Sequence, residues 1–213
     1  MKSIEELKKR MKKELDCSRY YHTIGVMYTA ASLAMCYGVE LENAMIAGIL
    51  HDCAKCIPDN EKIRLCKEYG ISLTETEIQN TALIHPKLGA YLAEHKFGVT
   101  DQEILDAIAG HTTGHPEMTI LEKIVFIADY IEPGRNTAPH LTMVRRTAFE
   151  DLDLTMYRIL KDTLDYLREK GGVIDTMTEK TYQYYKKLTL EEEESEDGTG
   201  KTDGKTCISG VRR

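Results

Sequence analysis

Apolar residues in this chain recur at three- and four-residue intervals almost everywhere, which is the spacing that gathers them on one face of an α-helix. Alternating runs of β-branched residues bounded by turn residues, which would indicate strands, are missing. The pattern therefore predicts an all-α fold, a helical bundle. With 213 residues, 42% of them hydrophobic, the chain is long enough to bury one core, and we expect a single folded domain over residues 1–190.

Start and stop signals divide the chain into helices. A Ser or Thr followed three residues later by Glu can form a capping box, in which the two side chains satisfy free backbone N–H groups; it occurs at Ser3, Thr74, Thr100 and Thr119. Glycines that can close a helix in the left-handed conformation follow at Gly38, Gly70, Gly98 and Gly171. We expect helices at about residues 19–37, 42–52, 60–69, 75–95, 101–111, 120–131, 143–170 and 179–188.

Charge and composition exclude several functional classes. The formal net charge of −7 argues against a surface for nucleic acid or for anionic membranes. No stretch reaches the length of an apolar membrane span, and the N-terminal segment lacks the apolar run of a secretory signal. The six cysteines therefore predict free thiols in a cytoplasmic protein. Cys53 and Cys56 form a CxxC motif without a second pair for zinc and without βαβ surroundings, so we expect a structural role for them.

Residues 191–213 have a different composition from the rest of the chain. Their sequence, EEEESEDGTGKTDGKTCISGVRR, offers little to bury, and it predicts an acidic, disordered tail. The GTGKT within it is similar to part of a phosphate-binding loop. However, Ser195 stands where that motif requires glycine, and no buried strand precedes it, so we expect no nucleotide site there.

Imidazoles and carboxylates stand in strongly apolar helical segments at several places, although burying them is costly. His51 and Asp52 end the run AMIAGILHD, and Asp129 lies within KIVFIADYIE. The histidines in comparable segments are His22, His85 and His111. A divalent cation would neutralise such a set of side chains. The alternatives are a polar helix end facing solvent for His51 and Asp52, and a hydrogen-bonded core histidine for His22.

The order of these residues resembles the metal-binding signature of the HD-domain phosphohydrolase superfamily, whose members are all-helical. The segments RYYHTIGV, GILHDCAK, ALIHPKLGA, AGHTTG and IADYIEPGR are similar to those of the YqeK-type HD proteins, which are bacterial symmetrical diadenosine tetraphosphatases. The resemblance spans about residues 19–188. It implies that residues 1–190 form an HD domain and that the chain cleaves Ap4A into two ADP.

The resemblance also implies two divalent metal ions, both iron, with manganese or cobalt as substitutes. By analogy with the superfamily, His22, His51 and Asp129 would hold one metal, His85 and His111 the other, and Asp52 would bridge the two. A mixed set of imidazoles and carboxylates suits a first-row transition metal. Two such cations about 3.5–4 Å apart can bind a bridging hydroxide, which is the expected nucleophile.

Basic and hydroxyl side chains near these ligands are candidates for contacts with the substrate. Because ADP is a good leaving group, positioning and charge stabilisation should matter more than a general acid. The expected catalytic residues are Asp52, Lys55 and Arg135. The expected substrate contacts are Lys55, Lys87, Thr112, Thr113, His115 and Arg135. The alternative for each is a solvated surface charge or a helix cap, and Arg19 is a weaker candidate.

Two other functions stay open at this level. One is an HD-type phosphohydrolase acting on another nucleotide, and the other is a nucleotide-binding regulator without turnover. A complete ligand set argues against the regulator. The expected partner is a small dinucleoside polyphosphate, with no nucleic acid and no membrane, and the sequence leaves a homodimer open.

Overall fold

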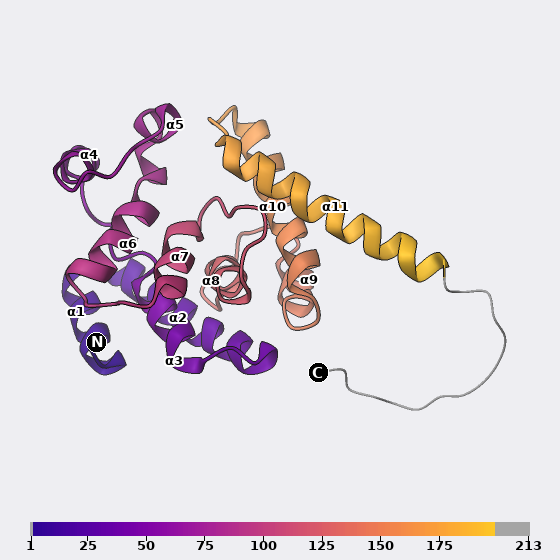
Figure 1. Cartoon of the computed structure of the whole chain (residues 1–213), viewed down its shortest axis with the longest axis horizontal. Coiled ribbons are helices and arrows are strands. Elements are labelled where there is room, and N and C mark those ends of the chain that lie inside the picture. Colours follow the sequence, from indigo (N-terminus) through magenta and orange to yellow (C-terminus); the bar gives the residue numbers. More distant parts are fainter. Residues whose placement is uncertain (1, 199–213) are drawn as a thin grey trace.

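All regular secondary structure in the computed structural model, which describes residues 2–198, is helical (Figure 1). The elements are α1 (Ile4–Glu14), α2 (Cys17–Tyr37), α3 (Leu41–Leu50), α4 (Asp59–Glu68), α5 (Glu75–Gln79), the 3-10 turn η1 (Thr81–Leu83), α6 (His85–His95), α7 (Gln102–Gly110), α8 (Ile120–Ile131), α9 (Leu141–Thr147), α10 (Leu152–Lys170) and α11 (Thr176–Gly198). No strand occurs within the described range, and the predicted all-α fold is confirmed.

Helix α2 packs mainly against α3 and α8. Its Val26, Met27, Ala30 and Leu33 have no exposed surface, as expected for a helix that is apolar on nearly all sides. Helices α2 and α3 approach closely because Gly48 lies against Met27, where an added Cβ would stand 2.8 Å from the Met27 Cα atom. This close packing brings together the parts of the two helices that carry the first histidines of the site.

Helix α8 lies between the N-terminal helices of the bundle and the C-terminal pair α10 and α11. It contacts α2, α3 and α7 on one side and α10 on the other, and α10 in turn packs against α11 (Figure 1). Its Ile124, Val125 and Ile127 are fully buried. The C-terminal end of α8 therefore lies beside α2. None of the described helices combines the length and the apolar character needed to cross a membrane.

Most of the expected helix caps are present. Ser3, Thr74 and Thr119 form capping boxes. The prediction at Thr100 is wrong, because the N-cap of α7 is the next residue, Asp101, whose carboxylate accepts the N–H of Glu103. Gly38 closes α2 with a φ of 71°, a left-handed conformation that glycine adopts without steric cost.

The single helix expected over residues 75–95 is interrupted. Helix α5 ends at Gln79, the turn η1 follows, and α6 begins at His85. Pro86 has no N–H and therefore fits only in the first turn of a helix, which explains the new start. As a consequence, His85 lies at the beginning of a helix and not in the middle of one.

The helix expected over residues 143–170 is likewise two helices, α9 and α10. Asp151 starts the second one, and its carboxylate accepts the N–H of Leu154. Helix α11 runs to Gly198 and therefore includes residues 191–198, the first part of the expected tail. The remainder of that tail, with most of the GTGKT segment, lies outside the described residues.

Candidate metal centre

Five helices bring the six candidate ligands into one buried cluster. His22 comes from α2, His51 and Asp52 follow α3, His85 begins α6, His111 follows α7, and Asp129 lies in α8. His51 and His85 have no exposed surface, while Asp52 and His111 are each 2% exposed. The alternative of a solvent-facing helix end for His51 and Asp52 is therefore wrong.

Three of the four histidines in the cluster are oriented by the main chain. The ring Nδ1 atoms of His51, His85 and His111 lie 2.7, 2.6 and 2.7 Å from the carbonyl oxygens of Gly48, Ala82 and Ile108, respectively. A carbonyl oxygen can only accept, so each Nδ1 donates its proton, and in the neutral ring the Nε2 atom then keeps a lone pair. Gly48 and Ile108 lie in the last turns of their helices, where carbonyl groups lack intrahelical partners.

Two imidazole nitrogens face Asp129 without hydrogen bonds. The Nε2 atoms of His22 and His51 are buried and have no hydrogen-bond partner among the described residues. The His22 Nε2 atom stands 3.0 Å from Asp129 Oδ1, and the His51 Nε2 atom stands 4.0 Å from the same oxygen. Lone pairs placed this close repel unless a proton or a cation lies between them. These three side chains fit a divalent cation, and the core-histidine alternative for His22 is not supported.

Asp52 faces two groups of imidazoles, one with each carboxylate oxygen. Its Oδ2 atom lies 3.3 Å from His51 Nε2 and 3.8 Å from His22 Nε2. Its Oδ1 atom lies 3.1 Å from His85 Nε2 and 3.7 Å from His111 Nε2. His51, Asp52 and His111 form a second set of side chains that could hold a metal. The geometry is suited to a carboxylate shared by two cations.

The protonation states in the cluster suit metal binding. Burial by itself would raise the pKa of Asp52 and of Asp129, but the neighbouring imidazoles outweigh it, and the pKa of both carboxyls lies well below its ordinary value. Burial lowers the pKa of His85 to about 4. At neutral pH the carboxylates are therefore ionised and His85 is neutral, which are the forms that bind cations.

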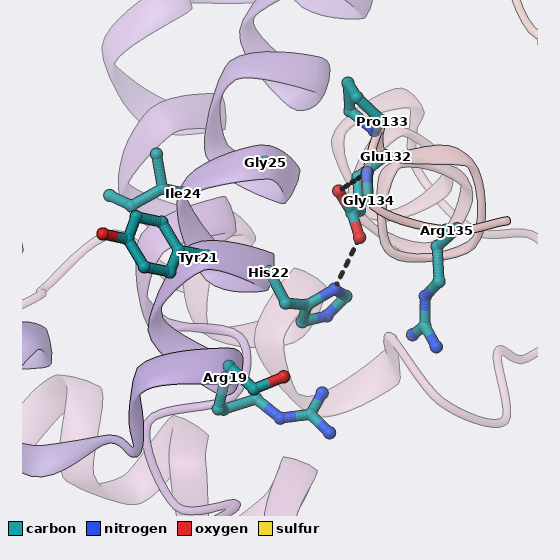
Figure 2. A pocket seen from close by; sticks show the side chains of 10 residues that line it. Arg19, Tyr21, His22, Ile24, Gly25, Glu132, Pro133, Gly134 and Arg135 are labelled. Atoms are coloured by element: carbon teal, nitrogen blue, oxygen red, sulfur yellow. Dashed lines mark hydrogen bonds and ion pairs between the residues drawn. The ribbon is translucent and has the colours of Figure 1, made fainter.

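Two arginines contact the carboxylates of the cluster. Arg19 Nη1 donates to Asp52 Oδ2 at 2.8 Å, and Arg135 Nη2 donates to Asp129 Oδ1 at 2.7 Å. Both arginines and His22 line a cavity of about 640 Å³ (Figure 2). Arg19, the weaker candidate from the sequence, thus lies directly at the centre. Its position three residues before His22, one turn along a helix, was the available signal.

Lys55 and Thr112 lie beside His85, one of the two imidazoles that face Asp52 Oδ1. Lys55 Nζ is 3.3 Å from His85 Nε2, and burial lowers the pKa of this lysine. Thr112 Oγ1 is 3.5 Å from the same His85 nitrogen. Both side chains are thus close enough to the cluster to meet a phosphate bound there.

Three other expected substrate contacts lie in a different cavity. Lys87, Thr113 and His115 line a space of about 590 Å³ that none of the six candidate ligands lines. Lys87 Nζ is paired with Glu77 at 2.8 Å, and Thr113 Oγ1 donates to the carbonyl of Gly114 at 3.2 Å. Their contact with substrate stays a prediction.

The CxxC motif has the geometry of structural thiols. Cys53 is buried, its Sγ atom donates to the carbonyl of Gly89 at 3.4 Å, and burial raises its pKa to about 12. Cys56 is exposed and donates to Asp16 Oδ2 at 3.3 Å. Both thiols are free.

Glu132 is a residue that the sequence analysis missed. It follows the last residue of α8 and is only 4% exposed, with Oε1 at 3.1 Å from His22 Nδ1 (Figure 2). The available signal was an acidic residue directly after an apolar helix and three positions beyond Asp129.

Comparison with known proteins agrees with this geometry. Residues 19–134 match the protein family described as HD domain, and this span contains all six candidate ligands. The chain belongs to the HD-domain family. The resemblance inferred from the sequence motifs is confirmed.

This HD-domain chain has relatives over most of its length. It is 39% identical over 180 residues to a Bacillus subtilis protein named symmetrical bis(5'-nucleosyl)-tetraphosphatase. The matched region covers 84% of this chain and 96% of the relative. A Halalkalibacterium halodurans protein of the same name is 41% identical, over 81% of this chain and 91% of the relative. A Clostridium acetobutylicum crystal structure, described as a predicted HD superfamily hydrolase involved in NAD metabolism, has a TM-score of 0.85 at 38% identity and covers 88% of this chain and 99% of its own.

Replacing Asp52 by Ala removes the two oxygens that face the two groups of imidazoles. We expect Asp52→Ala to lose at least about tenfold in metal affinity and to lose turnover. Elemental analysis of the purified protein measures the first effect. Asp165→Ala is the control, because that carboxylate is exposed on α10 and pairs with Lys161 and Arg168. Full metal content in Asp52→Ala would contradict the assignment.

The pair of His115 and Glu122 should make stability depend on pH. Both ring nitrogens face acceptors, at 2.7 Å from the carbonyl of Pro116 and 2.5 Å from Glu122 Oε1. Burial alone would lower the pKa of His115, but these hydrogen bonds outweigh it and raise the pKa. A pKa raised by folding stabilises the native state at low pH, and this contribution is lost as the pH rises through the folded pKa.

We therefore expect His115→Gln to reduce the free energy of unfolding more at about pH 5.5 than at about pH 9. Urea denaturation of both proteins at the two pH values measures the difference. His95→Gln, at an exposed position, is the control. An equal loss at both pH values would show that His115 is not protonated in the native state.

Proposed function

We propose that this chain hydrolyses Ap4A symmetrically to two ADP, using two divalent cations held by His22, His51, Asp52, His85, His111 and Asp129. The observation that carries the proposal is the buried cluster in which the two oxygens of Asp52 face separate groups of imidazoles. The names of the relatives that match over most of the chain give the substrate.

The chemistry at phosphorus needs an activated water and compensation of negative charge. Two divalent cations, when bound, supply both. The mixed imidazole and carboxylate ligands favour a first-row transition metal, and we propose iron, with manganese or cobalt as substitutes. Because the expelled ADP is a weak base, the remaining task of the protein is to position the phosphates and to neutralise them.

Arg19 and Arg135 are placed for that task. Each donates to one carboxylate of the cluster, Arg19 to Asp52 and Arg135 to Asp129. Once the carboxylates ligate cations, the guanidinium groups are free to turn to phosphate oxygens, which they bind in a planar, bidentate geometry. Lys55 adds a third positive charge on the side of His85. We therefore propose Lys55 and Arg135 as catalytic residues together with Asp52.

The centre borders two cavities, as a substrate with two nucleosides requires. The cavity beside Arg19 and His22 measures about 640 Å³, and a second cavity of about 450 Å³ is lined by His111 and Asp129. Arg135 lines both. The second cavity continues over Phe126, Ile159 and Tyr166, an apolar surface suited to a purine base. This arrangement supports a dinucleotide over a mononucleotide as substrate.

The free thiols at the described cysteines fit a reducing compartment, and we propose the cytoplasm. The proposed partner is a small dinucleoside polyphosphate.

The reaction is tested by incubating anaerobically purified protein with Ap4A and separating the products by anion exchange, with metal analysis of the same sample. We expect ADP as the sole product and about two metals per chain. AMP together with ATP would contradict symmetrical cleavage. Absence of turnover from fully metallated protein would contradict the proposed substrate and would favour another nucleotide or a regulatory role.

Removing the Arg135 side chain should weaken substrate binding and leave the ligands in place. We expect Arg135→Ala to reduce kcat/KM for Ap4A by at least about tenfold, because charged hydrogen bonds to phosphate are lost, with unchanged metal content. Arg64→Ala is the control, since among the described residues Arg64 pairs with Glu61 and Glu68 alone, on the exposed face of α4. Unchanged kinetics of Arg135→Ala would contradict its role.

A further inference from the structure

The turn that begins at the last residue of α8, residues 131–135, carries two side chains that contact the candidate ligands. Arg135 donates to Asp129, while Glu132 points back toward α2 (Figure 2). Glu132 Oε1 lies 3.1 Å from His22 Nδ1, and Oε2 accepts the main-chain N–H of Gly134 at 2.5 Å. Since a buried carboxylate is costly, both oxygens need such partners.

Two glycines leave room for this carboxylate. A Cβ atom added at Gly25, one turn beyond His22 on α2, would stand 2.4 Å from Glu132 Oε2. A Cβ atom added at Gly134 would stand 2.9 Å from Glu132 Oε1. Glycine at these two positions thus lets the carboxylate lie directly against α2 beside the His22 ring.

His22 needs an acceptor of this kind because of where it lies. The other three histidines use carbonyl groups at helix ends or in the turn η1, at Gly48, Ala82 and Ile108. His22 lies within α2, where the carbonyl groups are already bonded in the helix. A side chain from another element must therefore orient its ring, and Glu132 is in position to do so.

The turn itself is held by Arg145 from α9. Its Nε atom donates to the carbonyl of Ile131 at 2.9 Å, and its Nη2 atom donates to the carbonyls of Glu132 and Arg135, both at 2.8 Å. One planar guanidinium thus binds three main-chain oxygens of the same turn. The neighbouring Arg146 has a side chain that is 83% exposed and pairs with Glu150.

We propose that Glu132 and Arg145 are positioning residues of the metal centre. Glu132 accepts the Nδ1–H of His22 and so presents the lone pair of His22 Nε2 to the cation. Arg145 holds the turn that carries both Glu132 and Arg135, so it acts on the ligand and on the phosphate-binding arginine together. This inference rests on the proposed role of His22 as a metal ligand.

The test measures Mn²⁺ affinity by titration of the metal-free full-length protein, the thermal stability of the metal-free form, and the kinetics with Ap4A. In Glu132→Gln an NH2 group replaces one of the two carboxylate oxygens, and an NH2 group cannot accept the N–H of His22 or of Gly134. We expect it to lose about 10- to 100-fold in Mn²⁺ affinity, with metal-free stability close to that of the wild type. Gly25→Ala should show the same loss, because the added methyl group displaces the carboxylate.

Arg145→Lys is compared with Arg146→Lys as its matched control. Lysine lacks the planar fork needed to bind three carbonyls, so we expect Arg145→Lys to weaken Mn²⁺ binding and to raise KM for Ap4A. Arg146→Lys should behave like the wild type in both measurements.

Wild-type Mn²⁺ affinity in both Glu132→Gln and Gly25→Ala would overturn the positioning role of Glu132. Equal behaviour of Arg145→Lys and Arg146→Lys would overturn that of Arg145. Because the titration contains no nucleotide, its result is separate from the proposed reaction: a wild type that binds Mn²⁺ without cleaving Ap4A would contradict the proposed function alone.

Discussion

The compensation of one buried carboxylate, Asp52, constrains the arrangement of the helices around it. An ionised group that is 2% exposed must be surrounded by partners, and Asp52 has imidazoles on both oxygens and the Arg19 guanidinium on one. Those partners come from α2, α3, α6 and α7. Three of these four helices have an end at the centre: α3 and α7 end there, and α6 begins there.

The helix ends serve the chemistry in a second way. Carbonyl groups that lack partners at a helix end can accept a proton from a nearby histidine, and this selects the tautomer whose Nε2 faces the centre. His22, which lies inside a helix, depends instead on a carboxylate supplied from the end of α8. The same tertiary packing that buries the core of α8 thus also brings Glu132 to the first ligand.

Sequence reasoning predicted the helices and the candidate ligands because both depend on local patterns. Helical spacing, capping boxes and closing glycines are read within a few residues, and imidazoles in apolar runs stand out in the same way. The interruption before α6 was missed, although Pro86 indicated it, because the apolar pattern continues across the break. The local signal at Glu132 and Arg145 is weak, since an acidic or basic residue near a helix end is usually a solvated charge.

The sequence by itself determined the helical class and the set of side chains that could bind a cation. Only the tertiary structure decided which oxygen of Asp52 faces which imidazoles, that Arg19 lies at the centre, and that Lys87, Thr113 and His115 line another cavity. The physical reason is that helix formation and the cost of burying a charge depend on neighbours along the chain. The partners of a buried polar atom, by contrast, depend on how the helices pack. For example, Glu132 can lie against α2 because Gly25 has no side chain there.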